Sequence, residues 1–225
     1  MFQSVILAGG FGTRLKSLSG NKPKPMMDIG GIPFLYILMK KLEKHGCTKI
    51  VLSLFYEAEY IIQQVEKDKP VHCSVEYCVE TIPMGTGGAI KLSAEHITHD
   101  KFVVLNGDTY CDIDYKILLD RDTVADLLIV ANKVQDVQRF GKLEIDEHDN
   151  ILHMNEKNST GPGYINSGVY ILNKTSITSY PLKIFSFEND FIKSFDGTFK
   201  AYKTQTNFVD IGIPNDYNYA CQILT

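Results

Sequence analysis

Residues 4–15 read SVILAGGFGTRL, an apolar run followed at once by a glycine-rich loop and an arginine. The run over residues 4–7 is short and apolar, which predicts a strand. Gly9, Gly10 and Gly12 then remove side chains where backbone amides must approach a ligand closely. Successive exposed amides bind anions. The stretch therefore predicts a strand that ends in an anion-binding loop.

The rest of the first half repeats this alternation of strand and helix. Apolar runs predict further strands over residues 49–54, 74–79 and 102–105, and helical spacing predicts helices over residues 33–45, 57–67 and 88–96. Gly46 stands where the first of these helices should stop. Strands separated by helices imply right-handed crossovers. We therefore expect an α/β fold, a single three-layer, Rossmann-like domain with a mainly parallel mixed sheet.

The second half is less regular. We expect strands over residues 126–131, 142–145, 151–154 and 166–172, with a turn at Asp149-Asn150, and helices over residues 187–195 and 215–223. Pro214 would open the last helix. No repeat or linker divides the chain, so one domain over residues 1–225 is the simplest interpretation.

Composition excludes several classes of protein. The net charge of −4 argues against general nucleic-acid binding. The apolar stretch over residues 2–8 is too short for a secretory leader, and no run reaches the roughly 20 residues of a membrane span, so we expect a cytoplasmic protein. The 5 cysteines are odd in number and form no Cys-x-x-Cys pair, which favours buried free thiols.

Basic residues accompany the glycine loop. Thr13-Arg14-Leu15 continues it, and Lys24-Pro25 follows within NKPKPM. No Lys-Ser or Lys-Thr follows a glycine as a Walker loop requires, and the last glycine of a dinucleotide fingerprint is replaced by Leu15. A glycine loop alone is more often a packing feature, but with Arg14 and Lys24 it suits a triphosphate. Lys22 also precedes a proline and competes with Lys24 for this role.

Two aspartates follow apolar runs. Asp108 ends FVVLNGD, and Asp210 lies in FVDIGIP before a Gly-Ile-Pro turn. A lone aspartate at such a place is normally a cap or turn former. Two of them at the ligand edge of a sheet favour a site for magnesium, which takes hard oxygen ligands. Asp112 and Asp114 are treated as surface or turn residues.

Together these motifs resemble the nucleoside-diphosphate-sugar pyrophosphorylase family of nucleotidyltransferases. The resemblance covers nearly the whole chain and implies a GT-A-like nucleotidyltransferase fold. It also implies an enzyme that joins a sugar 1-phosphate to a nucleoside triphosphate with Mg²⁺ and releases pyrophosphate. By the same resemblance Asp108 and Asp210 would hold the metal, while Arg14 and Lys24 would bind the α-phosphate and the departing pyrophosphate.

The resemblance assigns the other site residues in family order. Residues 1–110 would form the mainly nucleotide-binding half and residues 111–225 the mainly sugar-phosphate-binding half. The nucleotide side would be lined by Leu7, Ala8, Gly9, Gly10, Gly12, Thr13, Asp108 and, from ETIPMGTGGA, Glu80 and Gly85. The sugar phosphate would be bound by Gly141, Glu156, Lys157 and Asn166, with Lys157 steering the incoming phosphate. Taken alone, Glu156-Lys157 would be a solvated surface pair and MGTGG a glycine-rich helix entry.

Two segments bear on the substrate. MGTGGAI (residues 84–90) and FSFENDFI (residues 185–192) look most similar to those of bacterial heptose 1-phosphate guanylyltransferases. That likeness implies GTP and D-glycero-D-manno-heptose 1-phosphate as substrates and GDP-heptose for a capsule or other surface glycan as the product. The alternatives are mannose or glucose 1-phosphate with GTP, UTP or dTTP, and a catalytically silent nucleotide-sugar-binding regulatory protein. The chain ends soon after FVDIGIPNDY, so we expect no carboxyl-terminal β-helix, and a homodimer is a family-level expectation.

Overall fold

The central feature of the fold is one mixed sheet. The computed structural model describes residues 1–10, 22–121, 125–154, 159–212 and 214–224. Within these residues a nine-stranded sheet has the order β10-β9-β11-β6-β1-β4-β5, and β8 joins it by pairing with both β11 and β12. Its strands are β1 Phe2–Leu7, β4 Cys47–Leu54, β5 Ser74–Val79, β6 Lys101–Asn106, β8 Leu127–Val134, β9 Leu143–Ile145, β10 Ile151–Met154, β11 Gly163–Asn173 and β12 Phe199–Thr204.

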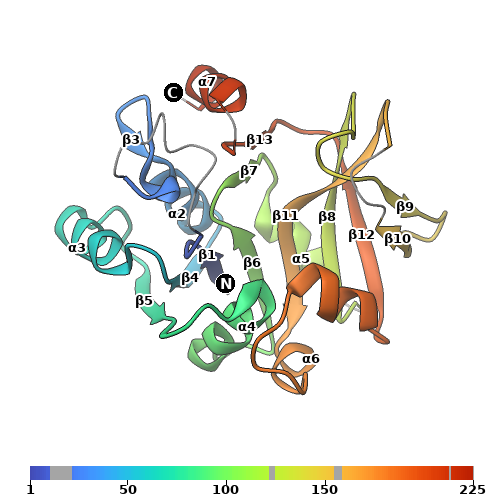
Figure 1. The fold of residues 1–225 in the computed structure, drawn as a ribbon, viewed down its shortest axis with the longest axis horizontal. Helices are drawn as coiled ribbons and strands as arrows, with labels where there is room; N and C mark the ends of the chain where they lie inside the picture. Colours follow the sequence, from blue (N-terminus) through green and yellow to red (C-terminus); the bar gives the residue numbers. More distant parts are fainter. Residues whose placement is uncertain (11–21, 122–124, 155–158, 213, 225) are drawn as a thin grey trace.

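The first half of the chain is parallel, as predicted. β1 pairs in parallel with both β4 and β6, and β5 continues in parallel beyond β4. The crossover helices are α2 Phe34–Lys44, α3 Ala58–Asp68 and α4 Gly85–Ser93, the last extended by a 3₁₀ turn, η3 Ala94–His96. Figure 1 shows α2 on one side of these strands and α4 on the other, which gives the expected three layers. Gly46 ends α2 with a φ of 92°, in the left-handed region that favours glycine.

The second half is mainly antiparallel. β11 runs antiparallel to β6 and to β8, and β9 and β10 form a hairpin at the sheet edge. The sequence did not predict β12, which pairs in parallel with β8, nor the short helices α5 Tyr115–Arg121 and α6 Lys174–Thr178. The helix expected over residues 187–195 is a single π turn, η4 Phe187–Phe191, followed by a 3₁₀ turn, η5 Ile192–Ser194. The last helix, α7 Pro214–Ile223, begins at the predicted proline.

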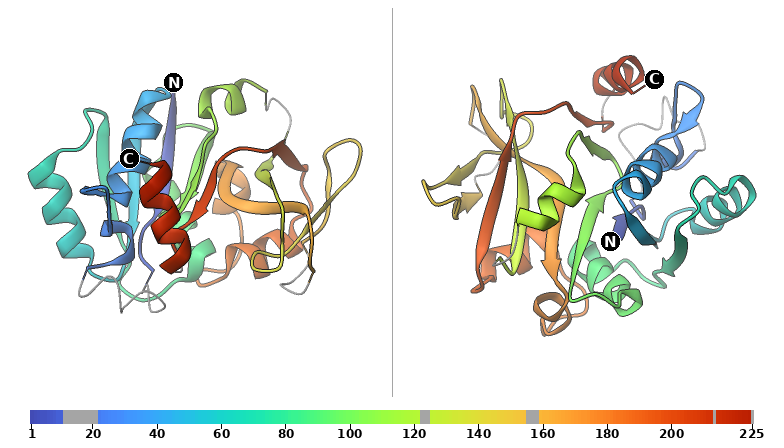
Figure 2. Two further views of the ribbon diagram at one scale, coloured as in Figure 1. Left: turned by 90° about the horizontal axis from the view of Figure 1, so that it is seen from above. Right: turned by 180° about the vertical axis from the view of Figure 1, so that it is seen from behind.

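Small elements join the two halves. β7 Thr109–Cys111 pairs antiparallel with β13 Phe208–Asp210, and β2 Asp28–Ile29 pairs with β3 Ile32–Pro33 after a 3₁₀ turn, η2 Lys24–Met26. α7 returns to the first half of the chain, where the Tyr217 hydroxyl donates to the Asp28 carbonyl at 2.5 Å (Figure 2). The carboxyl-terminal helix α7 therefore packs against the amino-terminal half of the chain.

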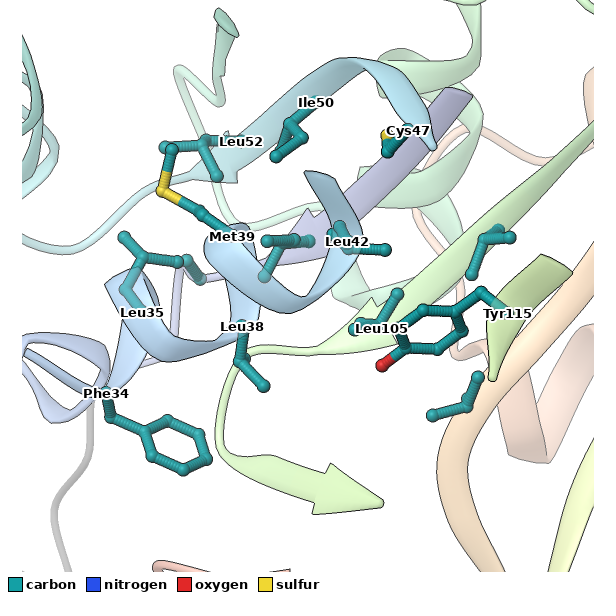
Figure 3. Packing of buried hydrophobic residues seen from close by; sticks show 14 of the residues in the cluster. Phe34, Leu35, Leu38, Met39, Leu42, Cys47, Ile50, Leu52, Leu105 and Tyr115 are labelled. Atoms are coloured by element: carbon teal, nitrogen blue, oxygen red, sulfur yellow. The ribbon is translucent and has the colours of Figure 1, made fainter. Parts of the chain in front are cut away.

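The central strands are buried on both faces. In β1, Ile6 packs in the cluster under α2 and α3, whereas Val5 packs in the cluster under α4. Successive strand residues point to opposite faces, so a continuous apolar run serves both layers. Figure 3 shows Leu35, Leu38, Met39 and Leu42 of α2 over β4 and β6. Each such fully buried side chain contributes about 1.5–3 kcal/mol relative to exposure.

The cysteines are free thiols, as predicted. Cys47, Cys78 and Cys111 are buried, whereas Cys73 and Cys221 are only partly buried. Burial raises the pKa of the Cys47 and Cys111 thiols, which keeps them protonated and unreactive. In the part of the chain that the structure describes, no helix is both long enough and apolar enough to span a membrane.

Candidate active site

A pocket lies where the central parallel strands end. It has a volume of about 450 Å³ and receives residues from the ends of β1, β4 and β6 and from the start of α4. This is the edge at which open α/β sheets bind ligands. The described residues that line it are Leu7, Gly9, Gly10, Lys24, Pro25, Ser53, Phe55, Glu80, Pro83, Gly85, Thr86, Ala89, Asn106, Gly107, Asp108 and Gly212.

The structure brings Lys24, Asp108 and Asp210 together at this pocket. Lys24 Nζ lies 2.6 Å from Asp108 Oδ2 and 3.7 Å from Asp210 Oδ1. The two aspartates are far apart in sequence but adjacent in space, because β13 pairs with β7 and the Ile211 amide donates to the Asp108 carbonyl at 3.0 Å. Both carboxylates are thus held by backbone pairing, with one ammonium group between them.

Local backbone geometry fixes each carboxylate. Gly107 lets the turn before Asp108 pass close to β1: its amide donates to the Leu7 carbonyl at 2.9 Å, and a Cβ there would lie 2.4 Å from that oxygen. The Gly212 amide donates to Asp210 Oδ1 at 2.7 Å. Any side chain on Gly107 would displace the turn that carries Asp108, and the Gly212 amide holds the Asp210 carboxylate in place.

The electrostatics of this cluster suit a cation. Burial, and then the negative charge of Asp108, raise the pKa of Asp210, while Lys24 opposes the shift. Two nearby carboxylates repel each other unless positive charge lies between them, and here the Lys24 ammonium occupies such a position. Carboxylate oxygens are ligands that Mg²⁺ prefers, and Mg²⁺ is usually held by one or two of them together with substrate phosphates. Asp108 and Asp210 therefore fit a magnesium site, although the described residues contain no cluster of three or more His, Cys, Asp or Glu side chains suited to a metal.

The structure distinguishes between Lys22 and Lys24 as candidates for the phosphate-binding lysine. Lys22 Nζ pairs with Asp28 Oδ2 at 2.5 Å, and both side chains are nearly half exposed. The side chain of Lys24 is only 11% exposed and faces Asp108. Of these two residues, only Lys24 lines the pocket.

The described part of the first glycine loop has both packed and open positions. A Cβ on Gly9 would lie 2.9 Å from the Phe55 amide nitrogen, so Gly9 is needed for packing against the end of β4. Gly10 is exposed, and among the described residues a Cβ there would meet nothing within 4 Å, so none of them covers its backbone. Leu7 lines the pocket, whereas Ala8 is buried, and its amide donates to Ser53 O at 2.8 Å. The other predicted residues of this loop, Gly12, Thr13 and Arg14, lie outside the described residues.

The second glycine-rich segment has a use that the sequence did not reveal. The Gly87 and Gly88 amides donate to the Phe185 carbonyl at 3.0 and 3.3 Å. A Cβ on Gly85 would lie 2.5 Å from that same oxygen, and one on Gly88 would lie 2.4 Å from the Lys183 carbonyl oxygen. These glycines therefore let residues 183–187 dock against the start of α4. Gly85 also lines the pocket with its backbone.

Glu80 lines the same pocket and is buried. Its Oε2 accepts a hydrogen bond from the Met84 amide at 2.8 Å. Burial raises the pKa of Glu80, and the bond from Met84 opposes this shift. A buried carboxyl anchored through one oxygen can present the other to a ligand.

The residues predicted to bind the sugar phosphate do not gather at the pocket as the nucleotide-side residues do. Among the described residues, Gly141 and Asn166 are not part of the pocket lining. Gly141 has a φ of 83° in the connection between β8 and β9, and its amide donates to the Val137 carbonyl at 3.1 Å. Asn166 lies in β11, where its side chain bonds to Tyr170 and Glu188. Glu156 and Lys157 lie outside the described residues.

Sequence reasoning missed several lining residues. Ser53 is one of the last two residues of β4 and Phe55 directly follows that strand, while Asn106 ends β6 and Gly107 follows it, so the rule that led to Asp108 would have found them. Thr86 stands beside Gly85 at the start of α4, where a polar side chain is a reasonable ligand contact. Pro83 and Ala89 carry no such signal, because apolar residues near a turn or on a helix are ordinary packing residues.

Comparison with known proteins agrees with the site. A family model described as nucleotidyl transferase matches residues 3–220. The chain is 36% identical over 222 residues to a D-glycero-alpha-D-manno-heptose 1-phosphate guanylyltransferase of Campylobacter jejuni, with 96% of each chain covered. It is 34% identical over 223 residues to the protein of the same name from Aneurinibacillus thermoaerophilus, with 97% of this chain and 96% of the relative covered.

A solved structure is similar over the full length. The crystal structure of HddC from Yersinia pseudotuberculosis superposes with a TM-score of 0.95 at 51% identity, with 100% of both chains covered. The same protein described as complexed with GMP-PN gives a TM-score of 0.94 at 52% identity, again with 100% of both chains covered.

Proposed function

The chain belongs to the nucleotidyl transferase family, and on that premise we propose that it joins GTP to D-glycero-D-manno-heptose 1-phosphate, giving GDP-heptose and pyrophosphate. Its membership makes it a nucleotidyltransferase enzyme. The choice of heptose and guanine is supported by full-length relatives that carry the name heptose 1-phosphate guanylyltransferase and by a similar structure described as complexed with GMP-PN.

The observation that carries the proposal is the cluster of Lys24, Asp108 and Asp210, in which Lys24 and Asp108 line a pocket of about 450 Å³ and Asp210 lies beside them. Asp108 and Asp210 would hold Mg²⁺, which supplies neutralisation of the negative charge on the reacting phosphates. Lys24 would offset charge on the leaving pyrophosphate. This combination serves phosphoryl transfer, which depends mainly on positioning and electrostatic stabilisation.

The reaction needs no general base. A sugar 1-phosphate, with a second pKa near ~6, is largely dianionic at neutral pH. One of its oxygens forms a bond to the α-phosphorus of GTP, and the bond from that phosphorus to the oxygen that joins the α- and β-phosphates breaks. The electron pair leaves with pyrophosphate, so charge develops on the side where Lys24 would bind. Arg14 and Lys157 would assist on the leaving and incoming sides, and both assignments stay predictions.

Glu80 supports guanine as the base. An ionised carboxylate only accepts hydrogen bonds, and guanine presents two neighbouring donors, N1–H and the 2-amino group, on its pairing edge. Uracil and thymine present one donor flanked by two acceptors, which a carboxylate matches less well. One oxygen of Glu80 is anchored by the Met84 amide, so the other would face the base. Glu80→Gln should reduce the preference for GTP over UTP and dTTP.

The test is pyrophosphate release over a matrix of nucleoside triphosphates and sugar 1-phosphates with Mg²⁺. The proposal expects the highest kcat/KM for GTP with D-glycero-D-manno-heptose 1-phosphate. A maximum with mannose or glucose 1-phosphate, or with UTP or dTTP, would move the protein to a sister activity of the same family. Tight binding of a nucleotide sugar with no turnover anywhere in the matrix would make it a silent regulatory protein instead.

Other features remain predictions. A cytoplasmic location rests on the composition of the sequence, whereas a role in a capsule or other surface glycan and a homodimer rest on family resemblance. Sedimentation of the purified protein tests the dimer directly.

A further inference from the structure

Residues 185–192, FSFENDFI, are docked beside the pocket. The Phe187 amide donates to Thr86 Oγ1 at 2.9 Å, and Thr86 lines the pocket. The Phe185 carbonyl accepts from the Gly87 and Gly88 amides. The segment then forms the π turn η4, which the Ser186 side chain caps. Single π turns are uncommon and frequently mark functional sites.

Glu188 of this turn reaches across to β11. Its Oε1 accepts hydrogen bonds from Asn166 Nδ2 at 2.8 Å and from the Tyr170 hydroxyl at 3.3 Å. Asn166 Nδ2 also donates to the Tyr170 hydroxyl at 2.8 Å, and Asn166 Oδ1 accepts from the Gly168 amide at 2.9 Å. The orientation of the Asn166 amide is therefore fixed from both ends.

This group of side chains lies next to Asp108. β11 runs antiparallel to β6 (Figure 1) with Val169 opposite Leu105, and a Cβ on Gly168 would lie 2.7 Å from Asn106 Nδ2, two residues before Asp108. A Cβ on Gly168 would lie 2.6 Å from Thr109 Oγ1, which confirms that the two segments touch. Burial, the charge of Glu188 and, more weakly, the charge of Asp108 raise the pKa of Tyr170. The hydrogen-bonded pair of Tyr170 and Glu188 therefore lies on the side of β11 from which the charge of Asp108 is felt.

Glu188 has unused capacity for a ligand. Both of its internal bonds end on Oε1, and no donor within the described parts of the chain bonds to Oε2. The residue is exposed although it is tied to a buried tyrosine. A carboxylate oxygen in this state accepts strong, charge-assisted hydrogen bonds from hydroxyl groups.

We propose that Glu188 determines specificity for the sugar of the sugar 1-phosphate, with Oε2 accepting from neighbouring sugar hydroxyls while Oε1 holds Asn166 toward the same sugar. The inference rests on the proposed function, because it names the part of the substrate that this residue reads. It also gives the FSFENDFI segment a function: its docking on α4 sets the distance between the nucleotide pocket and the sugar-binding side chain.

Glu188→Gln tests this proposal. Glutamine keeps an oxygen for Asn166 and Tyr170 but replaces the second carboxylate oxygen with an amide nitrogen, which cannot accept. Hydrogen bonds to charged groups are strong enough that the KM for D-glycero-D-manno-heptose 1-phosphate should rise about tenfold or more. The KM for GTP should stay within about twofold, because Glu188 does not line the nucleotide pocket. Glu147→Gln makes the same chemical change at a side chain that is 87% exposed and is the matched control.

The outcomes are separable. Wild-type turnover with an unchanged sugar-phosphate KM in Glu188→Gln overturns the role of Glu188 and leaves the proposed function standing. Equal increases in both KM values, or a large fall in Tm, would show a purely structural role and also overturn it. Absence of wild-type turnover on every sugar phosphate overturns the proposed function and this inference with it. Glu188→Ala, which also frees Asn166, should raise the sugar-phosphate KM further than Glu188→Gln does.

Discussion

The two halves of the molecule contribute to the site in different ways. In the first half, up to Asp108, the central strands are parallel and the pocket residues follow directly where those strands end. In the second half the main strands are largely antiparallel. Asp210 is not itself among the described residues that line the pocket, but the short strand β13, outside the main sheet, carries it to Lys24 and Asp108 at the pocket edge. The first half thus provides most of the pocket, and the second half provides the second carboxylate.

The difference shows that the reactive centre lies where the halves meet. Asp108 and Asp210 are held together by the β7–β13 pair, and Lys24 bridges their charges. Glu188 and Asn166 approach from the second half on the other side of Asp108. Neither half alone presents the complete set of groups, so variants at the meeting line should affect catalysis more than variants within either half.

The largest effect should come from removing either carboxylate. Asp108→Asn and Asp210→Asn should each lower kcat about 10²–10³-fold, the usual loss when one preorganised charge-stabilising group is removed. Steady-state pyrophosphate release measures this, and circular dichroism checks that the fold is intact. Asp120→Asn changes an exposed aspartate on α5 and is the control. Full activity in Asp210→Asn, with Asp108→Asn inactive, would mean that the reaction does not require the carboxylate that the second half provides.

The lysines should give the next largest effect. Lys24→Met keeps the length of the side chain but removes the ammonium between the two carboxylates, and should lower kcat about 10²-fold. It should also lower Tm, since Asp108 and Asp210 then repel each other without compensation. Lys22→Met removes a half-exposed ion pair with Asp28 and should change both quantities little. Equal losses in the two variants would contradict the assignment of Lys24.

The first half of the fold was predictable because its signals are local. Short apolar runs identify the strands β1, β4, β5 and β6, and the segments of helical spacing between them indicate that these strands run parallel. β12 was missed for a physical reason: in FKAYKT, Lys200 and Lys203 stand three positions apart, so the segment shows neither a continuous apolar run nor the strict alternation of a half-buried strand. It is recognisable as a strand only once its partner β8 is known. The π turn at residues 187–191 was read as ordinary helix because its apolar spacing is similar.

The site was predictable to a comparable degree. Asp108 follows from its place at a strand end, and Lys24 from its motif. The meeting of Asp108 with Asp210 depends on β7–β13 pairing between residues far apart in the chain, which no local pattern encodes. Gly85 of MGTGG was expected on the nucleotide side and lines the pocket, whereas no sequence pattern indicated that Gly87 and Gly88 accommodate residues 183–187. A glycine pattern indicates close approach but does not identify what approaches.

The two glycine-rich segments should respond differently to alanine. Gly88→Ala forces a Cβ against the Lys183 carbonyl, and overpacking of this kind costs about 1–3 kcal/mol. In a chain of this length each kcal/mol lowers Tm by about 2–4 °C. Gly10→Ala should leave Tm unchanged, because a Cβ there meets no atom of the described residues within 4 Å, yet weaken GTP binding if the loop amides contact the phosphates. Thermal melting with and without GTP separates the two effects, and equal Tm values in the two variants would contradict the docking of residues 183–187.

The smallest effect concerns pH and Asp210. Its folded-state pKa is raised above the ordinary value of 3.8 by burial and by Asp108, so the native state binds this proton more tightly than the unfolded chain does. The ionised carboxylate therefore costs stability at any pH above the folded pKa, and the cost disappears as pH falls below 3.8. Asp210→Asn, which cannot ionise, should have a higher Tm than the wild type at pH 7 even though it loses activity, and the difference should shrink on acidification. If Asp210→Asn were less stable than the wild type at pH 7, the attraction between Asp210 and Lys24 would outweigh the cost of burying the Asp210 carboxylate beside Asp108. The two halves would then attract each other at this point, whereas the raised pKa implies that they are held together against a repulsion.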